Sequence, residues 1–448
     1  MEFEDKLLKK VKSIRSYNKL YNLPIDMFYK AHKKGLKVEN VVETPVKILL
    51  LTSTCNGFGD VIFSYKLKQY LKEWYDYLVD VKIATNSVKQ FTSIGEKLDD
   101  LIHLKTKAKD FQCRRFNTMK PYNAYQFITN DRLIEEDIES FDLYFVAPIT
   151  ADFKPDFKEI HTLVKNSNRF NTFFLTEYNS PIHKDIAFNV GVGKGRVGMF
   201  LIDKPEVKPS KLPNLDYPYS IIYIAKNDDY LEKCYEGFME LLTSKHKYPR
   251  LDIVTPDWMM EIVERDIEYI LDSVDNYYST IKCIYKKDGQ TLEKVLARDG
   301  NGRGEIVFRF DVFPVPFDKV ISLYQHSLPH VLLTGDQSIT DFLSIRYKDS
   351  VPYYQGLPWK QNFYTTLAKV LPNKFFKSYK TSCGNIKAIK YDPNFNKFIK
   401  KYDFRVNAKP LMDAIVMSVG YKSDIYTDVK KVIAKSRDLQ TVKKKLSL

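Results

Sequence analysis

The feature that most constrains the fold of this chain is the alternation of short apolar runs with helical patterns. "VKILLLTS", which begins at Val46, is a continuous apolar run, as is typical of a buried strand. The segment that follows the next turn, "VIFSYKLKQYLKEWYDYL", has large apolar side chains at helical spacing: Phe63, Leu67, Tyr70, Leu71 and Trp74. Further strand-like runs are "VDVKIATN", "FDLYFVAPI" and "TFFLTEY". Strands that alternate with helices predict a parallel sheet with helices on its faces.

A second alternation follows a proline-rich stretch, "DKPEVKPSKLPNLDYPY". It includes the strands "YSIIYIA", "RLDIVT", "STIKCIYK" and "HVLLT", with helical patterns between most of them. We therefore predict an α/β protein with two doubly wound, Rossmann-like domains and basic helical additions at both ends. The predicted segments are a helical N-terminal extension (1–45), a first domain (46–205), a linker (206–219), a second domain (220–392) and C-terminal helices (393–448). Ligands of such sheets bind at the carboxyl ends of the strands, so a cleft between two facing domains is the expected site.

Composition excludes several classes of protein. With 44% apolar residues in 448, the chain has enough to form packed cores. Its five cysteines are scattered and form no Cys-x-x-Cys, which argues against a disulfide framework and indicates a reducing compartment. The start, "MEFEDKLLKK", lacks the apolar core of a signal peptide, and no run of 18 apolar residues occurs. We expect a cytoplasmic protein.

The net charge of +14 is compatible with an anionic partner, such as nucleic acid, an anionic membrane surface or a phosphorylated substrate. For most of these lysines, a solvated lysine-rich surface is the favoured interpretation. Zinc-finger spacing and the aromatic signature of an RNA-binding sheet are missing, which argues against nucleic acid. Neither His-Glu-x-x-His nor Asp-x-Asp occurs in the sequence, so we expect metal-independent chemistry and no cofactor.

Two strand-to-helix turns are the candidate sites. The first, "CNGFGD", contains Asn56, Gly57, Phe58, Gly59 and Asp60. Glycines let a ligand approach the backbone closely, and the free N–H groups at a helix start favour an anion. Asp60 has a second interpretation that is at least as good, because a carboxylate at or near the N-cap accepts hydrogen bonds from the helix N–H groups.

The second turn, "TGDQS", contains Thr334, Gly335, Asp336, Gln337 and Ser338 and suits a diphosphate. Its alternative interpretation is a capping box, with Ser338 as N-cap and Asp341 three residues later. Both interpretations can hold together. Beyond it, in "GLPWK", Lys360 could meet a phosphate, or the turn could merely place Trp359 in the core.

A third glycine-rich stretch, "GKGRVG", matches the dinucleotide fingerprint Gly-x-Gly-x-x-Gly. That fingerprint requires a helix after it. Here "MFLID" follows, an apolar and strand-like run, so we reject a dinucleotide site. The loop is expected to precede a strand, and Lys194 and Arg196 could line the interdomain cleft.

The two turns carry a resemblance. "NGFGDVIFSYKLKQYL", "YSIIYIAKN" and the segment from "DVFPVPF" through "HVLLTGDQSITDF" resemble parts of the protein-arginine rhamnosyltransferases, a bacterial family of GT-B glycosyltransferases. The resemblance implies an N-terminal acceptor domain and a C-terminal nucleotide-sugar donor domain. It also implies that Asp60 is the general base and Gly59 the turn glycine. Gly335 and Ser338 would belong to the donor-diphosphate loop, and Asp336 stands where the family has a catalytic glutamate.

This sequence departs from the family at three positions. Thr334 stands where the family has arginine, Gln337 where it has aspartate, and Val315 about where it has a base-reading glutamine. The nucleotide, the sugar and the acceptor therefore stay open.

The favoured hypothesis is inverting, metal-independent transfer of a hexose or deoxyhexose from a nucleotide diphosphate to a protein or glycan. One alternative is a non-enzymatic basic protein that binds nucleic acid or a partner. Another is a nucleotide-sugar epimerase.

Overall fold

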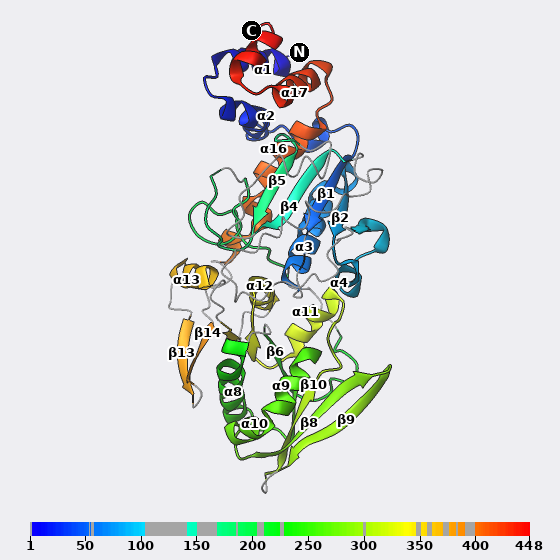
Figure 1. Ribbon diagram of the computed structural model, residues 1–448, viewed down its shortest axis with the longest axis vertical. Coiled ribbons are helices and arrows are strands. Elements are labelled where there is room, and N and C mark those ends of the chain that lie inside the picture. Colours follow the sequence, from blue (N-terminus) through cyan, green and yellow to red (C-terminus); the bar gives the residue numbers. More distant parts are fainter. Residues whose placement is uncertain are drawn as a thin grey trace. The chain divides into compact units, whose positions relative to one another are not determined.

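The chain forms two compact α/β units (Figure 1). The computed structural model describes residues 2–52, 54, 58–103, 141–149, 168–184, 187–203, 210–224, 228–298, 302–345, 351–355, 361–370, 376–381, 384–389 and 399–448. Unit 1 comprises Met1–Thr92, Glu96–Phe200 and Tyr402–Leu448, and unit 2 comprises Ser93–Gly95 and Leu201–Lys401. No helix in the described part of the chain is long and apolar enough to cross a membrane.

Unit 1 is built on a five-stranded parallel sheet in the order β3-β2-β1-β4-β5. The strands are β1 (Val46–Thr52), β2 (Val79–Thr85), β3 (Leu101–His103), β4 (Leu143–Ile149) and β5 (Thr172–Thr176). The order reverses between β1 and β4, as at the ligand-binding switch point of a doubly wound sheet. Helix α3 (Gly59–Tyr75) connects β1 to β2 and buries the apolar face predicted for it.

Unit 2 has a nine-stranded mixed sheet in the order β13-β14-β12-β11-β6-β7-β10-β8-β9. Its six central strands are parallel: β12 (Val351–Tyr354), β11 (His330–Leu333), β6 (Tyr219–Tyr223), β7 (Arg250–Val254), β10 (Gly304–Arg309) and β8 (Tyr278–Lys287). The order reverses between β6 and β11, so unit 2 has its own switch point. The α/β class with two Rossmann-like sheets is confirmed.

The sequence did not predict the antiparallel edges of this sheet. They are β9 (Gln290–Arg298), β13 (Phe376–Thr381) and β14 (Gly384–Ile389). Strand β9 is mostly exposed and intersperses polar and charged residues among its apolar ones, so it lacks the continuous apolar run that marks a buried strand. The available signal was Asp288-Gly289, because both residues adopt the positive φ of a tight hairpin turn.

The helices of unit 2 are α8 (Asp228–Lys245), α9 (Met260–Arg265), α10 (Ile267–Ser273), α11 (Phe317–His326), α12 (Asp336–Ile345) and α13 (Gln361–Val370). The apolar spacing of "DWMMEIVERDIEYIL" predicts a single helix, and this prediction is wrong. That stretch forms the short 3-10 turn η4 (Asp257–Met259), α9 and α10, with a break at Asp266. The carboxylate of Asp266 accepts hydrogen bonds from Tyr235 at 3.2 Å and from Arg265 at 2.6 Å, which satisfies the buried polar group at the break.

The N- and C-terminal helices pack together within unit 1. They are α1 (Glu2–Ser13), α2 (Tyr17–His32), α15 (Phe404–Asn407), α16 (Lys409–Gly420), α17 (Asp424–Lys435) and α18 (Leu439–Lys445). The remaining short elements of this unit are α4 (Val88–Ser93), η1 (Val38–Asn40), η2 (Asp76–Leu78) and η3 (Leu98–Asp100), and η6 (Lys400–Tyr402) spans the boundary with unit 2. Helix α16 is a core helix, because its residues from Met412 to Gly420 are all buried. Its buried Asp413 accepts hydrogen bonds from Tyr75 Oη at 2.7 Å and Lys409 Nζ at 2.8 Å.

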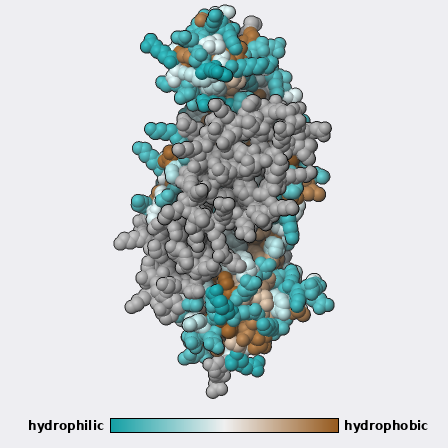
Figure 2. All heavy atoms as spheres, in the orientation of Figure 1, coloured by the Kyte–Doolittle hydropathy of each residue, from teal (hydrophilic) through white to brown (hydrophobic). Residues whose placement is uncertain are grey.

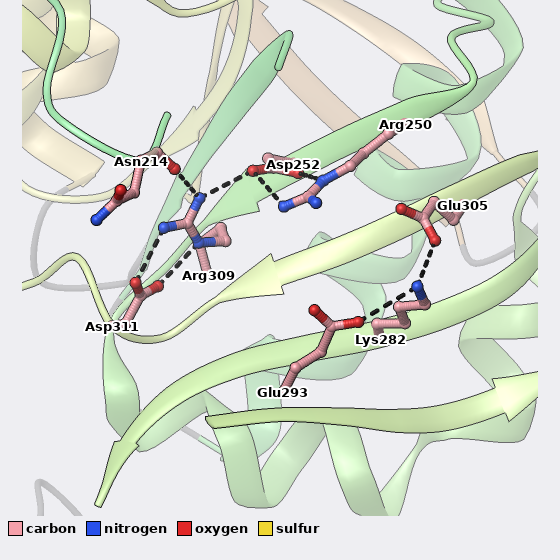
Figure 3. A network of polar contacts seen from close by, with 8 residues as sticks. All are labelled: Asn214, Arg250, Asp252, Lys282, Glu293, Glu305, Arg309 and Asp311. Atoms are coloured by element: carbon pink, nitrogen blue, oxygen red, sulfur yellow. Dashed lines mark hydrogen bonds and ion pairs between the residues drawn. The ribbon is translucent and has the colours of Figure 1, made fainter. Parts of the chain in front are cut away.

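The described part of the proline-rich stretch, residues 210–218, is fastened to the sheet of unit 2 by a buried network (Figure 3). Arg309, at the end of β10, donates two hydrogen bonds of 2.9 Å to Asp311 and one of 3.0 Å to Asp252. The same guanidinium reaches the backbone oxygen of Asn214 at 2.5 Å. Arg250 completes the pairing of Asp252 at 2.7 Å. Arg309 therefore compensates two carboxylates inside the protein, so its charge is already used in stabilising the fold.

Candidate functional site

The first candidate turn lies at the carboxyl end of β1, next to the switch point of unit 1. Helix α3 begins at Gly59, and Phe58 occupies the N-cap position without a capping side chain. Asp60 is the second helical residue and is partly exposed, so it lies near the N-cap and not at it. A Cβ built on Gly59 would have no atom of the described residues within 4 Å. The start of α3 is thus open on this side. Asn56 and Gly57 lie outside the described residues.

A group of hydrogen bonds, which the sequence did not predict, holds the chain just before this turn. The backbone N–H of Thr54 donates to Asn86 Oδ1 at 2.8 Å, and Asn86 Nδ2 donates to the carbonyl of Thr54 at 3.0 Å. The Thr54 hydroxyl also donates to Gln90 at 2.9 Å. The side-chain amide of Asn86 therefore pairs with both backbone groups of Thr54, as a neighbouring strand would, and holds the chain where it leaves β1. The only hint in the sequence was an asparagine directly after the second strand.

The second candidate turn lies at the carboxyl end of β11, at the switch point of unit 2. Thr334 continues the sheet, since its N–H donates to the carbonyl of Tyr223 at 2.8 Å. Gly335 has φ +80°, and a Cβ built on it would meet nothing within 4 Å. Helix α12 starts at Asp336. The turn thus combines a glycine of positive φ with the start of a ten-residue helix, whose first N–H groups have no partner within the helix itself.

The hydroxyl of Thr334 is a buried polar group at this turn. The residue is 8% exposed, and its Oγ1 is buried with no hydrogen-bond partner among the residues that the structure describes. A buried hydroxyl without a partner costs about 1–3 kcal/mol, so native proteins rarely leave one without a reason.

The capping-box interpretation of this turn is wrong. Helix α12 begins at Asp336, so Ser338 and Asp341 both lie inside it. The side chain of Ser338 hydrogen-bonds the phenol of the buried Tyr324 on α11. Asp336 and Gln337 are each 6% exposed. Ser338 therefore contacts α11 through its side chain, and its contribution to an anion site would come from its backbone N–H.

A second buried hydroxyl, which the sequence analysis missed, lies at the same edge of the sheet. Thr255 directly follows β7, is 0% exposed, and has no hydrogen-bond partner for Oγ1 within the described ranges. Strands β11, β6 and β7 are neighbours, so the ends of β11 and β7 lie two strand spacings apart, or roughly 10 Å. The signal was present as a threonine directly after each strand, in "LLTG" and "IVTP".

The glycine-rich loop differs from its prediction. "MFLID" does not form a strand, and Met199 only bridges to Asp403 in the described part of unit 1. Arg196 is half-buried, donates to the backbone carbonyls of Ser180 and Val190, and burial lowers its pKa. The guanidinium of Arg196 therefore stabilises its own loop, whereas Lys194 is exposed.

Within the described ranges, no group of three His, Cys, Asp or Glu side chains could hold a metal ion. Two histidines do meet: His246 Nε2 and His330 Nδ1 are 2.8 Å apart. Burial, followed by the charge of His246, lowers the pKa of His330 to about 4. His330 begins β11, so this pair lies at the opposite end of that strand from Thr334. Lys360, predicted to meet a phosphate, lies outside the described residues.

No family model matches the chain, and no curated protein matches it. Solved structures that resemble it include a protein described as a UDP-N-acetylglucosamine 2-epimerase from Listeria monocytogenes, with 12% identity, 87% of this chain and 95% of that chain covered, and a TM-score of 0.38. An α-glucosyltransferase in complex with UDP and DNA is 8% identical, with 88% of this chain and 100% of that chain covered and a TM-score of 0.37. A glycosyltransferase from Rickettsia africae is 11% identical, with 90% of this chain and 99% of that chain covered and a TM-score of 0.34.

At these scores the likenesses carry no argument about activity. The class of protein follows from the sheets themselves: the chain has two Rossmann-like α/β units, each with a strand-to-helix turn at its switch point.

Proposed function

We propose that the chain is a glycosyltransferase of the GT-B type that takes its sugar from a nucleotide diphosphate. The observation that carries the proposal is the turn after β11, where the open Gly335, the start of α12 and the buried hydroxyl of Thr334 converge. N–H groups at a helix start bind phosphate oxygens, and a helix dipole favours negative charge there. A diphosphate at this turn would accept a hydrogen bond from the Thr334 hydroxyl. The hydroxyl of Thr255 would serve the same ligand farther along the edge.

The proposed reaction is an inverting displacement. An acceptor hydroxyl or amine attacks the anomeric carbon, the bond from that carbon to the phosphate oxygen breaks, and the nucleotide diphosphate leaves. The acceptor's proton passes to the carboxylate of Asp60, the general base. The N–H groups of α12 stabilise the negative charge that develops on the leaving diphosphate. Asp336, in the first turn of α12, is proposed to assist at the donor, in the place of the family's glutamate.

The metal-independent and inverting character of this reaction, and a protein or glycan as acceptor, belong to the proposal. The resemblance to the protein-arginine rhamnosyltransferases supports them through Asp60, Gly335 and Ser338. No match in the comparisons adds support for that particular family.

Binding is tested by thermal unfolding of the whole chain with UDP, TDP, GDP and ADP and with their sugars. A nucleotide at roughly 100 times its dissociation constant should stabilise the protein by about 2.7 kcal/mol. The decisive variant is Thr334→Val, which keeps the shape and removes the hydroxyl. It should weaken nucleotide binding roughly 10- to 100-fold, because a hydrogen bond to a charged group contributes about 1.5–3 kcal/mol.

Without ligand, Thr334→Val should be as stable as the wild type or more stable, because a buried hydroxyl without a partner is removed. Thr340→Val is the matched control. The Thr340 hydroxyl is also buried, but it donates to the carbonyls of Asp336 and Gln337 within α12. Its loss should leave nucleotide affinity unchanged. If both variants bind every nucleotide as the wild type does, the donor site is not at this turn.

Catalysis is tested with Asp60→Asn in an assay of nucleotide release from the sugar donor that binds best. Loss of a general base should slow turnover roughly 100- to 10,000-fold while nucleotide affinity stays the same. Full activity of this variant would remove Asp60 from the mechanism. Conversion of the nucleotide sugar to an isomer, with no free nucleotide, would identify an epimerase instead.

A further inference from the structure

The N- and C-terminal helices form a separate basic surface, which we call the terminal lobe: residues 2–35 and 421–448. It contains 17 Lys and Arg residues against 7 Asp and Glu residues, a net charge of +10 out of +14 for the whole chain. The lobe is therefore where most of the excess charge of this protein lies. The two halves of the lobe are far apart in the sequence, so the folded structure is what concentrates this charge.

The lobe is a packed structure with its apolar side chains inside. Phe28 and Tyr426 are 1% and 0% exposed, and their rings pack with those of Phe3 and Tyr421. Lys443 Nζ donates to the carbonyl of Lys12 at 2.8 Å, which joins α18 to α1. The N- and C-termini consequently lie at the same end of unit 1 (Figure 1).

The basic side chains face outward. The exposed ones are Lys6, Lys9, Lys12, Arg15, Lys19, Lys30, Lys33, Lys34, Lys422, Lys431, Lys435, Arg437, Lys444 and Lys445. Figure 2 shows mostly hydrophilic residues over this lobe. In the described part of the chain, only three of these exposed bases have an acidic partner within 4.0 Å: Lys6, Lys422 and Lys431. The others present uncompensated charge to the solvent.

Basic side chains that lie close together repel one another, and this repulsion destabilises the lobe. At the half-buried Lys430, burial is the main cause that lowers the pKa to about 8, and the neighbouring charge of Lys422 adds a smaller contribution. Net charge of one sign destabilises the compact state through self-repulsion. A binding partner of opposite charge removes that repulsion.

We propose that the terminal lobe docks unit 1 on an anionic lipid bilayer. Of its 17 basic residues, 15 are lysines and 2 are arginines. Lysine is a compact point charge that suits the diffuse negative potential of a membrane, whereas nucleic-acid sites favour the bidentate fork of arginine and exposed rings for stacking. Here no aromatic residue of the lobe is fully exposed, since Phe28 and Tyr426 are buried and the other five are half-buried. The one large apolar side chain exposed on α17 is Ile425, 48% exposed beside Asp424, where it can enter the headgroup region.

The experiment measures co-sedimentation of the full chain with vesicles of phosphatidylglycerol and, separately, of phosphatidylcholine. We expect binding to phosphatidylglycerol only, and weaker binding as salt is added. The variant Lys444→Gln/Lys445→Gln should bind about 25-fold more weakly, since each lysine near an anionic surface contributes about fivefold in affinity. The matched control is Lys286→Gln/Lys287→Gln, which removes the same charge from two exposed lysines of unit 2. It should bind like the wild type.

Three results would overturn the proposal. The first is equal binding to both lipids. The second is an equal loss in both variants, which would mean that net charge alone matters. The third is binding to duplex or single-stranded DNA more tightly than to phosphatidylglycerol at the same salt, with the same dependence on Lys444 and Lys445, which would assign the lobe to nucleic acid.

Discussion

Replacing Arg309 with methionine probes the buried network that fastens residues 210–218 to the sheet of unit 2 (Figure 3). The guanidinium is 3% exposed and donates to Asp252, which is 0% exposed, and to Asp311, which is 9% exposed. Methionine fills much of the same volume but leaves Asp311 with no described ion pair. Asp252 retains only Arg250.

Breaking a buried ion pair by removing one partner typically costs about 3–5 kcal/mol, because an uncompensated charge stays buried. The matched control is Lys282→Met on the neighbouring strand β8. Its ammonium is 22% exposed and pairs with Glu305 at 2.7 Å. Pairs with access to water contribute about 1 kcal/mol or less, so this variant should lose little.

The assay is urea unfolding followed by tryptophan fluorescence in a Trp74→Phe background. Of the three tryptophans, only Trp74 belongs to unit 1, so this background reports on unit 2. Arg309→Met should lower the free energy of unfolding by several times more than Lys282→Met. The double variant Arg309→Met/Asp311→Leu should recover part of the loss, because one stranded carboxylate is gone.

A loss in Arg309→Met no larger than that in Lys282→Met would refute the reasoning. So would a double variant less stable than Arg309→Met alone, since it would show that the stranded carboxylate is not the cost.

Two further predictions concern pH and backbone conformation. Because the pKa of His330 is lowered to about 4, the unfolded state binds the proton more readily, and stability should fall as pH drops from about 6.5 to 4. In His330→Gln, the free energy of unfolding, measured with urea at a series of pH values, should depend less on pH in this range. An unchanged dependence on pH would contradict the prediction. Gly198→Ala should destabilise unit 1 in thermal unfolding, because Gly198 has φ +100° and a Cβ would lie 2.4 Å from the carbonyl oxygen of Tyr402. Gly35→Ala, with φ +97° but nothing within 4 Å, is the control and should cost only about 1–2 kcal/mol. Equal losses would exclude the steric argument.

The alternation in the sequence predicted the parallel strands because burial on both faces requires a continuous apolar run. Strand β1, "VKILLLT", is such a run and lies at the centre of its sheet. The helical spacing of apolar residues likewise predicted α3 and the turn between β1 and α3. It could not find β9, whose residues face water, nor the break at Asp266, which depends on Tyr235 from another helix.

Part of the candidate site could likewise be predicted from the sequence, and part could not. The sequence located the turn at Thr334 to Ser338, because glycine and small polar residues at the end of an apolar run are a local pattern. It could not show that the Thr334 hydroxyl is buried without a described partner, that Thr255 repeats this two strands away, or that Ser338 contacts Tyr324.

By itself, then, the sequence determined the buried parallel strands, most of the helices beside them, and where the turns between them hold polar residues. The tertiary structure alone decided how those residues are used. Arg309 and Lys444 are both basic, yet one is enclosed by carboxylates and the other joins a lobe built from both ends of the chain. Periodicity is a property of neighbouring residues. Burial and charge compensation depend on side chains that only folding brings together.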